Sequence, residues 1–464
     1  MSTGKRGRSR QPELFERSRT PTIPVPDNHR LVVMTDEIDW TDLEELIQAI
    51  RMSKLKSEAG RPPHLRALSG ALVLRATRKM TYRDTEDQIR YYAPARYLCG
   101  LTETEWSPDA NTIQDFEQLL GVDGVRQVNE RVVKWAVEEK LADPSLMVAD
   151  TTAQEAAIPY PNEVGHMAAF LSAVVAASGK AGNALLGFLK GVGTRVKEAK
   201  KKVRAHRLFA ETASAKKQLT TELADIVEEI NSELGRSLEV GKAQGERLKK
   251  HAKAAWGKLN ALNETMSQLL PQIRYWLRTG NVAAGKIINI HIPELYSIVR
   301  GKAGKAVEFG LKWGFARLRG GFVLATLASR GKADLADSVF ALQAVDQHIA
   351  LFGKPPKAYA YDRGGYSREN VEKLKAKGVE QVGLAPRGKA KWAVEKKVKD
   401  KLVNERAQVE GSIGAVKSGR YGFNRPAARS AEMMGVCGQR AVLGLNLNKV
   451  IRGLAERNEM ALVG

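Results

Sequence analysis

Short apolar runs that end at acidic residues constrain this chain to build a sheet. Leu146 to Ala149 form one such run, which is followed by Asp150. KAYAY (357–361) is followed by Asp362, and VEQVGLAP (379–386) is a further run. Runs of about four to eight mostly apolar residues between turn signals are typical of buried strands. Because helical patterns separate them, the sequence predicts an α/β fold, with a mixed sheet flanked by helices.

A hairpin and several helices complete this part of the pattern. AVEFGLKWGFARLR and FVLATLAS flank Gly320-Gly321, and alternating stretches around such a pair predict a hairpin. Trp313 lies in the first stretch, and we expect it in the core. Helices are predicted over 333–350, 367–378 and 402–417, with a further helical segment past Gly419.

The rest of the chain reads as three further regions. Residues 1–60 are a basic arm and a leading segment, and 61–143 form a compact all-helical unit. Thr81 and Asp109 are expected near helix starts, and Gly121 is expected to end the helix that begins near Ser107. Residues 167–287 are helical and polar, as in an antiparallel coiled coil inserted into the fold. The sheet domain then comprises 144–166 and 288–455.

The charge balance points to a polyanionic partner. Lys and Arg number 74 against 52 Asp and Glu, a formal net charge of +22 in 464 residues. Such an excess suits nucleic acid. We expect no membrane span, because the longest apolar run, MAAFLSAVVAAS, is short for a bilayer. The N-terminus lacks the apolar region of a secretory signal. Cys99 and Cys437 have no metal-like spacing, so a cytoplasmic, nucleoid-associated protein is expected.

One cationic segment lies within the predicted insertion. Between 190 and 217, ten Lys and Arg residues, among them Lys200, Lys201 and Lys202, accompany only Glu198 and Glu211. This run is either a solvated helix face or a surface that contacts the DNA backbone.

Three acids occupy related positions. Asp150 and Asp362 each follow a predicted strand, and Glu410 lies on the helix after the last strand. Residues at the carboxyl ends of strands face one crevice, where carboxylates repel unless cations offset them. Mg²⁺ is such a cation, and two ions can promote phosphodiester displacement. Arg406 and Lys417 share the Glu410 edge of the helix and would face DNA phosphates. The alternatives are a surface ion pair at 406–410 and strand-end acids that merely cap helices.

The motifs around these acids resemble a known family. VADTTAQEA, YDRGGYS and RAQVEGSIGAVKSGRYGF resemble the three acidic motifs of bacterial insertion-sequence transposases of the DDE type, which have a ribonuclease H-like catalytic core. RPPHLRALSGALVLRATRKMTYRDTEDQIR and SPDANTIQDF resemble the family's helical N-terminal domain, and HIPELYSIVRGKAGKAVEFGLKWGF resembles the stretch that leads into the second core strand. The likeness covers roughly 60–160 and 288–450.

The resemblance implies roles for individual residues. Asp150, Asp362 and Glu410 would be the catalytic metal ligands for two Mg²⁺ ions, with Mn²⁺ able to substitute. Arg406, Glu410 and Lys417 fit the spacing R-x3-E-x6-K of a family signature, but the Tyr that precedes the Arg by three residues in many relatives is Val403 here. A DNA-gripping role taken from that tyrosine does not transfer. We expect Arg363, Lys302 and Lys312 to contact DNA as well.

The expected function is therefore a DNA transposase. It would bind the terminal inverted repeats of its element, cleave them with water, and join the 3′-hydroxyl ends to target DNA, as a homodimer in the synaptic complex. Residues 61–143 are the expected DNA-binding domain, and either 61–121 or the 190–217 helix could dominate recognition of the ends. One rival is a nuclease on the same core that cuts without joining. The other is a basic, non-catalytic DNA-binding or architectural protein whose acids are structural.

Overall fold

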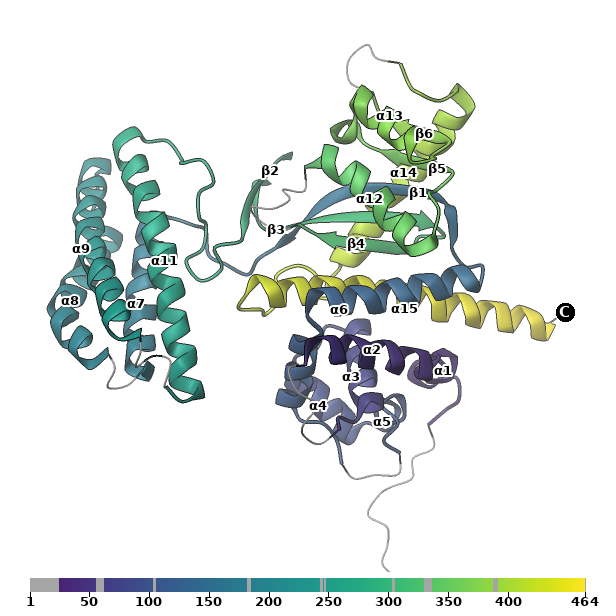
Figure 1. Cartoon of the computed structure of the whole chain (residues 1–464), viewed down its shortest axis with the longest axis horizontal. Coiled ribbons are helices and arrows are strands. Elements are labelled where there is room, and N and C mark those ends of the chain that lie inside the picture. The colour runs from purple at the N-terminus through teal and green to yellow at the C-terminus, as the bar shows by residue number, and fades with distance from the viewer. Residues whose placement is uncertain are drawn as a thin grey trace, which may run out of the picture.

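Helices surround a mixed sheet in this protein. The computed structural model describes residues 25–55, 62–102, 106–181, 185–242, 245, 248–302, 305–328, 336–386 and 391–463. Figure 1 shows a group of helices at the bottom of the view, the sheet above it, and a bundle of helices to the left. Two long helices, α6 (Ala110–Glu138) and α15 (Ala431–Val463), run between the sheet and the lower helices. Most of the predicted basic arm, residues 1–24, lies outside the described residues.

The lower helices come from the N-terminal part of the chain. They are α1 (Arg30–Glu37), α2 (Trp40–Lys54), α3 (Leu65–Thr77), α4 (Tyr82–Tyr91) and α5 (Ala93–Leu98). Thr81 caps α4 in a capping box, and Asp109 caps α6, as predicted. Gly121 interrupts α6 with φ 60°, but the helix resumes and continues to Glu138, so the predicted end was only a kink. Helices α1 and α2 precede residue 61 and share the hydrophobic cluster of α3.

The sheet is mixed, which agrees with the predicted α/β class. Its strands are β1 (Asp143–Glu155), β2 (Tyr296–Lys302), β3 (Lys305–Arg319), β4 (Val323–Leu327), β5 (Ala358–Tyr361) and β6 (Gln381–Leu384). Strand β3 is antiparallel to β1, β2 and β4, whereas β5 is parallel to β1 and β6 is parallel to β5. The predicted hairpin is confirmed, because Gly320 and Gly321 turn β3 into β4 with φ of 93° and 86°. Such positive φ values favour glycine.

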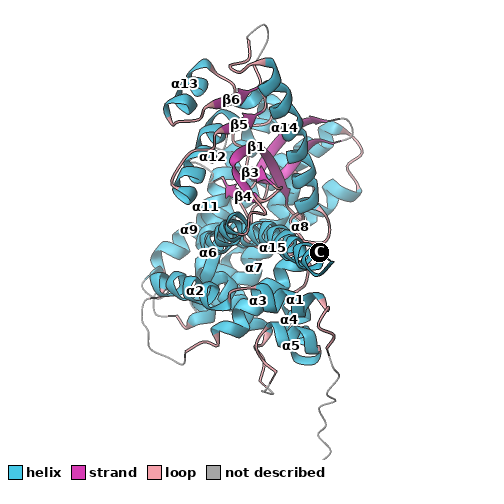
Figure 2. Cartoon of the chain, turned by 90° about the vertical axis from the view of Figure 1, so that its right-hand side faces the viewer, coloured by secondary structure: helices cyan, strands magenta, loops and turns pink. Residues whose placement is uncertain are grey.

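The two faces of the sheet carry different helices. Met147 and Tyr359 point to the face covered by α12 (Asp337–Phe352), in the same cluster as Phe340. Leu146, Val148, Ala358 and Ala360 point to the other face, where they pack against Leu402 and Val409 of α14 (Lys396–Lys417). This alternation follows the two-residue period of a strand. Helix α13 (Arg368–Ala376) connects β5 to β6. Figure 2 shows the strands enclosed by these helices.

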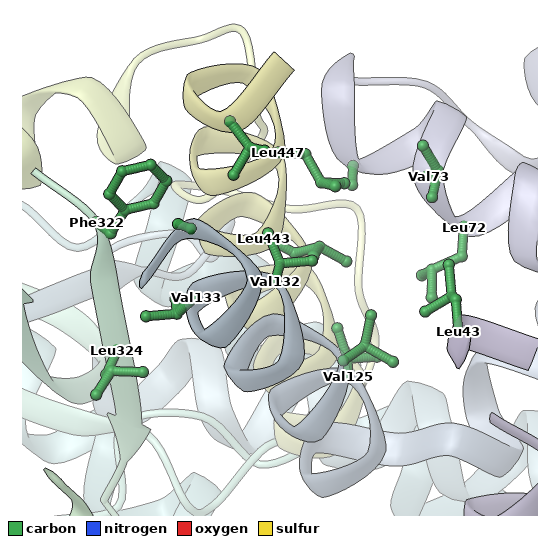
Figure 3. Close-up of a cluster of buried hydrophobic side chains, with 14 of the residues drawn as sticks. Leu43, Leu72, Val73, Val125, Val132, Val133, Phe322, Leu324, Leu443 and Leu447 are labelled. Carbon is green, nitrogen blue, oxygen red and sulfur yellow. The ribbon is translucent and has the colours of Figure 1, made fainter. Parts of the chain in front are cut away.

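Helices α6 and α15 join the sheet to the lower helices. Figure 3 shows their shared core, in which Leu72 of α3, Val132 of α6, Leu443 of α15 and Leu324 of β4 belong to one cluster. Burial of this apolar surface is the main favourable term that holds the two parts together.

A buried charge network lies in the same interface. Glu117 of α6 is fully buried and pairs with Arg75 of α3 at 2.7 Å and with Arg440 of α15 at 2.6 Å. The Tyr82 hydroxyl donates to the same carboxylate at 2.9 Å. Burial alone would raise the pKa of Glu117, but Arg440 and Arg75 outweigh it and lower that pKa. The network therefore requires α3, α6 and α15 to pack together.

The bundle to the left in Figure 1 is inserted between β1 and β2. Its described helices are α7 (Glu163–Ala181), α8 (Leu186–Leu208), α9 (Ala213–Val240) and α11 (Lys250–Thr279). They share a separate hydrophobic cluster, which includes Phe170, Val227 and Leu259. Among the described helices, α7 is long and apolar enough to cross a membrane by length and composition, contrary to the expectation from run length. Half of its apolar window is buried within the protein, as in a core helix.

Candidate active site

Asp150 and Asp362 lie next to each other on neighbouring parallel strands. Val148 of β1 is the partner of Ala360 of β5, and continuing this register by two residues places Asp150 beside Asp362. Asp362 directly follows β5 and accepts a hydrogen bond from the Gly364 N–H at 2.8 Å in the short turn η2 (Arg363–Gly365). Asp150 accepts one from the Thr151 N–H at 2.7 Å. Asp150 lies two residues after Val148, and Asp362 lies two residues after Ala360. Because Val148 and Ala360 face α14, the two-residue period places both acids on that face.

The position of Asp150 within its strand differs from the prediction. The strand does not end there, because β1 continues to Glu155 and stays paired with β3, from Asp150 opposite Phe315 to Glu155 opposite Gly310. Asp150 therefore lies inside a long strand, at the level where its shorter neighbour β5 stops. The side chain is held by a paired backbone rather than by a loop.

The two sides of helix α14 that border its buried stripe carry different side chains and face different parts of the sheet. On one flank, Glu405 pairs with Arg317 of β3 at 3.2 Å, and Arg317 lies opposite Val148, before Asp150 in β1. Arg406 lies on the other flank, and its positive charge acts to lower the pKa of Asp150. Glu410 follows Arg406 by one helical turn on that same flank. The stripe of Leu402, Val409 and Val416 is buried between the flanks, as the sequence predicted.

The environment of Asp150 disfavours its ionised form. Burial is the largest cause, and the nearby carboxylates of Asp362 and Asp337 add to it. The Thr151 N–H and the Arg406 guanidinium act in the opposite direction, but the pKa of Asp150 still rises to about 6. A carboxyl group crowded by other acids in a partly buried position is a common feature of functional sites.

Asp337 is a further acid of this site, and its sequence context does not indicate it. It occupies the first turn of α12 and accepts a hydrogen bond from the Thr151 hydroxyl at 2.7 Å and a longer one from the Tyr361 hydroxyl at 3.5 Å. These donors are the neighbours of Asp150 and Asp362 in sequence, so Asp337 links the middle of β1 and the end of β5 to α12. No apolar run precedes Asp337, and the strand-end pattern that marked the other acids gave no signal for it.

The described carboxylates do not form a closed ligand set. No group of three or more His, Cys, Asp or Glu side chains among the described residues lies close enough together to hold a metal ion. The structure thus brings Asp150 and Asp362 together and leaves the exposed Glu410 outside that pair. The pair itself offers only carboxylate oxygens, which are the donors that Mg²⁺ prefers. The metal-ligand role of all three residues stays a prediction.

A pocket of about 390 Å³ adjoins Asp362 on the α14 side. Its lining includes Asp362, Arg363, Trp392, Val403 and Arg406. The Arg406 Nε is buried and has no hydrogen-bond partner among the described residues. A buried donor without a partner is costly, and an anionic ligand in the pocket would satisfy it. Val403, at the position of the family's tyrosine, has an exposed fraction of 42%.

The other predicted DNA contacts are spread more widely. Arg363 is exposed at the pocket, and Lys417 is half-buried in the last turn of α14. The Nζ of Lys312 on β3 lies 5.5 Å from the ring centre of Tyr296. Lys302 ends β2, and its side chain lies outside the described residues. DNA contact by these four residues stays a prediction.

The cationic segment of the insertion lies on α8. Lys200 and Lys201 are exposed there, whereas Lys202 pairs with Glu222 of α9 at 2.6 Å. Lys202 therefore contributes to packing between two helices of the bundle. The two exposed lysines remain available to solvent or to a polyanion.

Comparison with known proteins bears on the N-terminal part of the chain. Residues 22–119 match a family model described as a transposase domain, DUF772. The matched segment holds the lower helices and the first part of α6, and its described residues include neither β1 nor any other strand. No curated protein and no solved structure matches. The match supports a transposase, as the sequence resemblance implied.

Proposed function

We propose that the protein is a DNA transposase of the DDE type, whose acids Asp150, Asp362 and Glu410 hold two Mg²⁺ ions, or Mn²⁺ in their place. The observation that carries this proposal is the adjacency of Asp150 and Asp362 beside the flank of α14 that bears Arg406 and Glu410. The transposase-domain match over 22–119 supports it from a separate part of the chain. The mixed sheet flanked by helices is compatible with a ribonuclease H-like core.

Each residue of the site would have a separate role. Asp150 and Asp362 are fixed by paired or hydrogen-bonded backbone, and they supply carboxylate oxygens to the ions. Two ions held there would supply activation of the attacking oxygen and stabilisation of the departing one. Arg406 would hold a phosphate of the DNA next to the acids, because its buried Nε has no partner among the described residues. Glu410, exposed one turn farther on, would complete the ligand set when DNA is bound.

The proposed substrate is double-stranded DNA. The protein would bind the terminal inverted repeats of its element, cut them, and join the released 3′-hydroxyls to target DNA, as a homodimer that holds both ends. The net charge of +22 supports a polyanionic substrate.

A cleavage assay tests this proposal. A labelled duplex that carries the element end is incubated with Mg²⁺ or with EDTA, and binding is measured in parallel. We expect cleavage only with the metal ion, and retained binding without cleavage for Asp150→Asn and Asp362→Asn. Asp143→Asn, at the start of the same strand as Asp150, serves as the matched control and should still cut.

The products separate the rivals. Joined products from paired ends support a transposase, whereas cutting without joining indicates a nuclease on the same core. Cleavage by Asp150→Asn at the wild-type rate would contradict the assignment. Salt-sensitive DNA binding with intact DNA under every metal condition would favour the architectural protein.

A further inference from the structure

A second pocket, larger than the one at Asp362, collects cations on the other flank of α14. It has a volume of about 650 Å³ and lies between the start of α1, the segment after α14, and α15. Its charged lining residues are Arg30, Arg420, Lys449 and Arg452, and no Asp or Glu is among its described lining residues. Four cations without a lining acid form an anion-binding surface.

This pocket is separate from the acidic site. Ala415 of α14 lines it, and five helical steps of about 100° place Ala415 roughly 140° around the helix from Glu410. Lys449 reaches toward the β3–β4 turn, with its Nζ 3.5 Å from the Gly320 carbonyl oxygen. That turn lies at the start of β1, since Arg319 pairs with Asp143, whereas the acids lie farther along the strand.

The cations are crowded, and neutral groups position one of them. Burial lowers the pKa of Lys449, and Arg317 and Arg452 lower it further. Arg30 donates to the Asn448 side-chain oxygen, and Asn448 in turn donates to the Tyr421 hydroxyl at 2.9 Å. Arg452 has an acidic partner in Glu456, at 3.7 Å on an exposed part of α15. The repulsion among the others is best offset by an anion that enters the pocket.

The row of positive charge continues beyond the pocket. The Lys79 N–H donates to the Arg420 carbonyl oxygen at 2.7 Å, which brings exposed Lys79 and Arg78 beside it. Arg30, Arg78 and Lys79 all belong to the segment that matches the transposase domain. A single small anion would need only the pocket, whereas an extended row suits a polymer with repeated phosphates.

We propose that this basic pocket binds the phosphodiester backbone of duplex DNA, on the opposite side of α14 from the phosphate that is cut. The proposal rests on the proposed function and adds a second contact to it. The pocket joins α1, from the matched domain, to α15, which packs on the sheet, so DNA bound there would contact both parts of the protein.

The test compares two double variants of equal charge. Arg420→Gln/Lys449→Gln removes two cations of the pocket, and Lys373→Gln/Lys375→Gln removes two exposed cations from α13. Dissociation constants for a labelled end duplex are measured by fluorescence anisotropy between 50 and 200 mM salt, in EDTA. Each lost phosphate contact lowers the salt slope by about 0.9, so the pocket variant should lose about 1.8 and bind about 30-fold more weakly at 0.15 M salt. The α13 variant should change little.

Folding and ligand identity are checked alongside. Because Lys449 is surrounded by like charges, its replacement by Gln should leave the unfolding temperature equal or higher. Equal affinity and slope in the two double variants would overturn the proposal. ATP and inorganic phosphate are titrated as small phosphate ligands, and binding of either that is lost in the pocket variant while DNA affinity is unchanged would also overturn it. If cleavage still depends on Asp150 and Mg²⁺ in that case, the proposed function stands; if the wild type neither binds nor cuts DNA, the function itself fails.

Discussion

Asp150→Asn should make the metal-free protein more stable at neutral pH, while it abolishes cleavage. Burial and the neighbouring acids raise the pKa of Asp150 to about 6 from an ordinary value of 3.8. A difference of about 2 pKa units, at about 1.4 kcal/mol each, corresponds to about 3 kcal/mol by which the ionised Asp150 carboxylate destabilises the folded state. Asparagine keeps the shape and the acceptor for the Thr151 N–H but carries no charge.

The effect should depend on pH with a defined sign. The folded protein binds the Asp150 proton more tightly than the unfolded chain does. Below about pH 4 the carboxyl is protonated in both states, so the penalty is absent there. Between about pH 4 and pH 6 the wild type loses stability relative to Asp150→Asn, and above pH 6 the whole difference is present. Thermal unfolding in EDTA at pH 7.5 should show an increase of up to about 3 °C, at about 1 °C per kcal/mol for a chain of this length, which vanishes near pH 4.

A matched control has the opposite sign. Hydrogen bonding to Ser145 lowers the pKa of Asp143, on the same strand, so Asp143→Asn should lose stability at pH 7.5. Added Mg²⁺ should stabilise the wild type more than Asp150→Asn, because ligand binding to the folded state adds stability. The reasoning is refuted if Asp150→Asn is no more stable than the wild type at pH 7.5, or if its advantage persists unchanged at pH 4.

Two further predictions concern the acids around the core. Glu117→Gln should destabilise the protein by about 3–5 kcal/mol in urea unfolding, because it leaves Arg75 and Arg440 buried without their carboxylate. Replacement of the exposed Glu138 by Gln is the control. An equal loss of stability in both variants would contradict the network's role. Asp337→Asn should remove one cause of the raised pKa of Asp150 and shift the acid limb of the cleavage profile to lower pH, with DNA affinity unchanged. An unshifted pH profile with a uniformly lower rate would assign Asp337 a structural role only.

Local patterns predicted most of the elements around the site. The hairpin followed from Gly320-Gly321, and the buried stripe of α14 followed from its helical period. Trp313 is buried, as expected. These features depend on residues close in sequence, where backbone preference and hydrophobic period carry the information.

Features that depend on tertiary contacts were missed. Strand β1 continues through polar residues because β3 pairs with it and because the buried Gln154 side chain has distant partners. Its amide donates to the Phe423 and Met434 carbonyl oxygens, and Trp313 donates to its oxygen. Helix α6 resumes after Gly121 because Val125 and Val132 pack into the shared core. Asp337 joins the site only through its contacts with Thr151 and Tyr361.

Part of the candidate site could also be predicted from local sequence patterns. Strand register brings Asp150 and Asp362 together, and an acid after an apolar run can be recognised in sequence. The distance of Glu410 from that pair depends on how α14 crosses the sheet, which no local pattern encodes. The crowding that raises the pKa of Asp150 likewise requires the folded arrangement.

The most direct test of the central claim is the rate of Mg²⁺-dependent cleavage of end DNA by Glu410→Gln, measured beside Asp400→Asn. Both acids are exposed on α14, but Asp400 lies on the side of the helix away from the buried stripe. If Glu410 completes the metal site with Asp150 and Asp362, its loss should slow cleavage by more than the roughly 10–100-fold that outer partners of metal ligands contribute. Asp400→Asn should cut at the wild-type rate. Equal rates for the two variants would contradict the three-acid site.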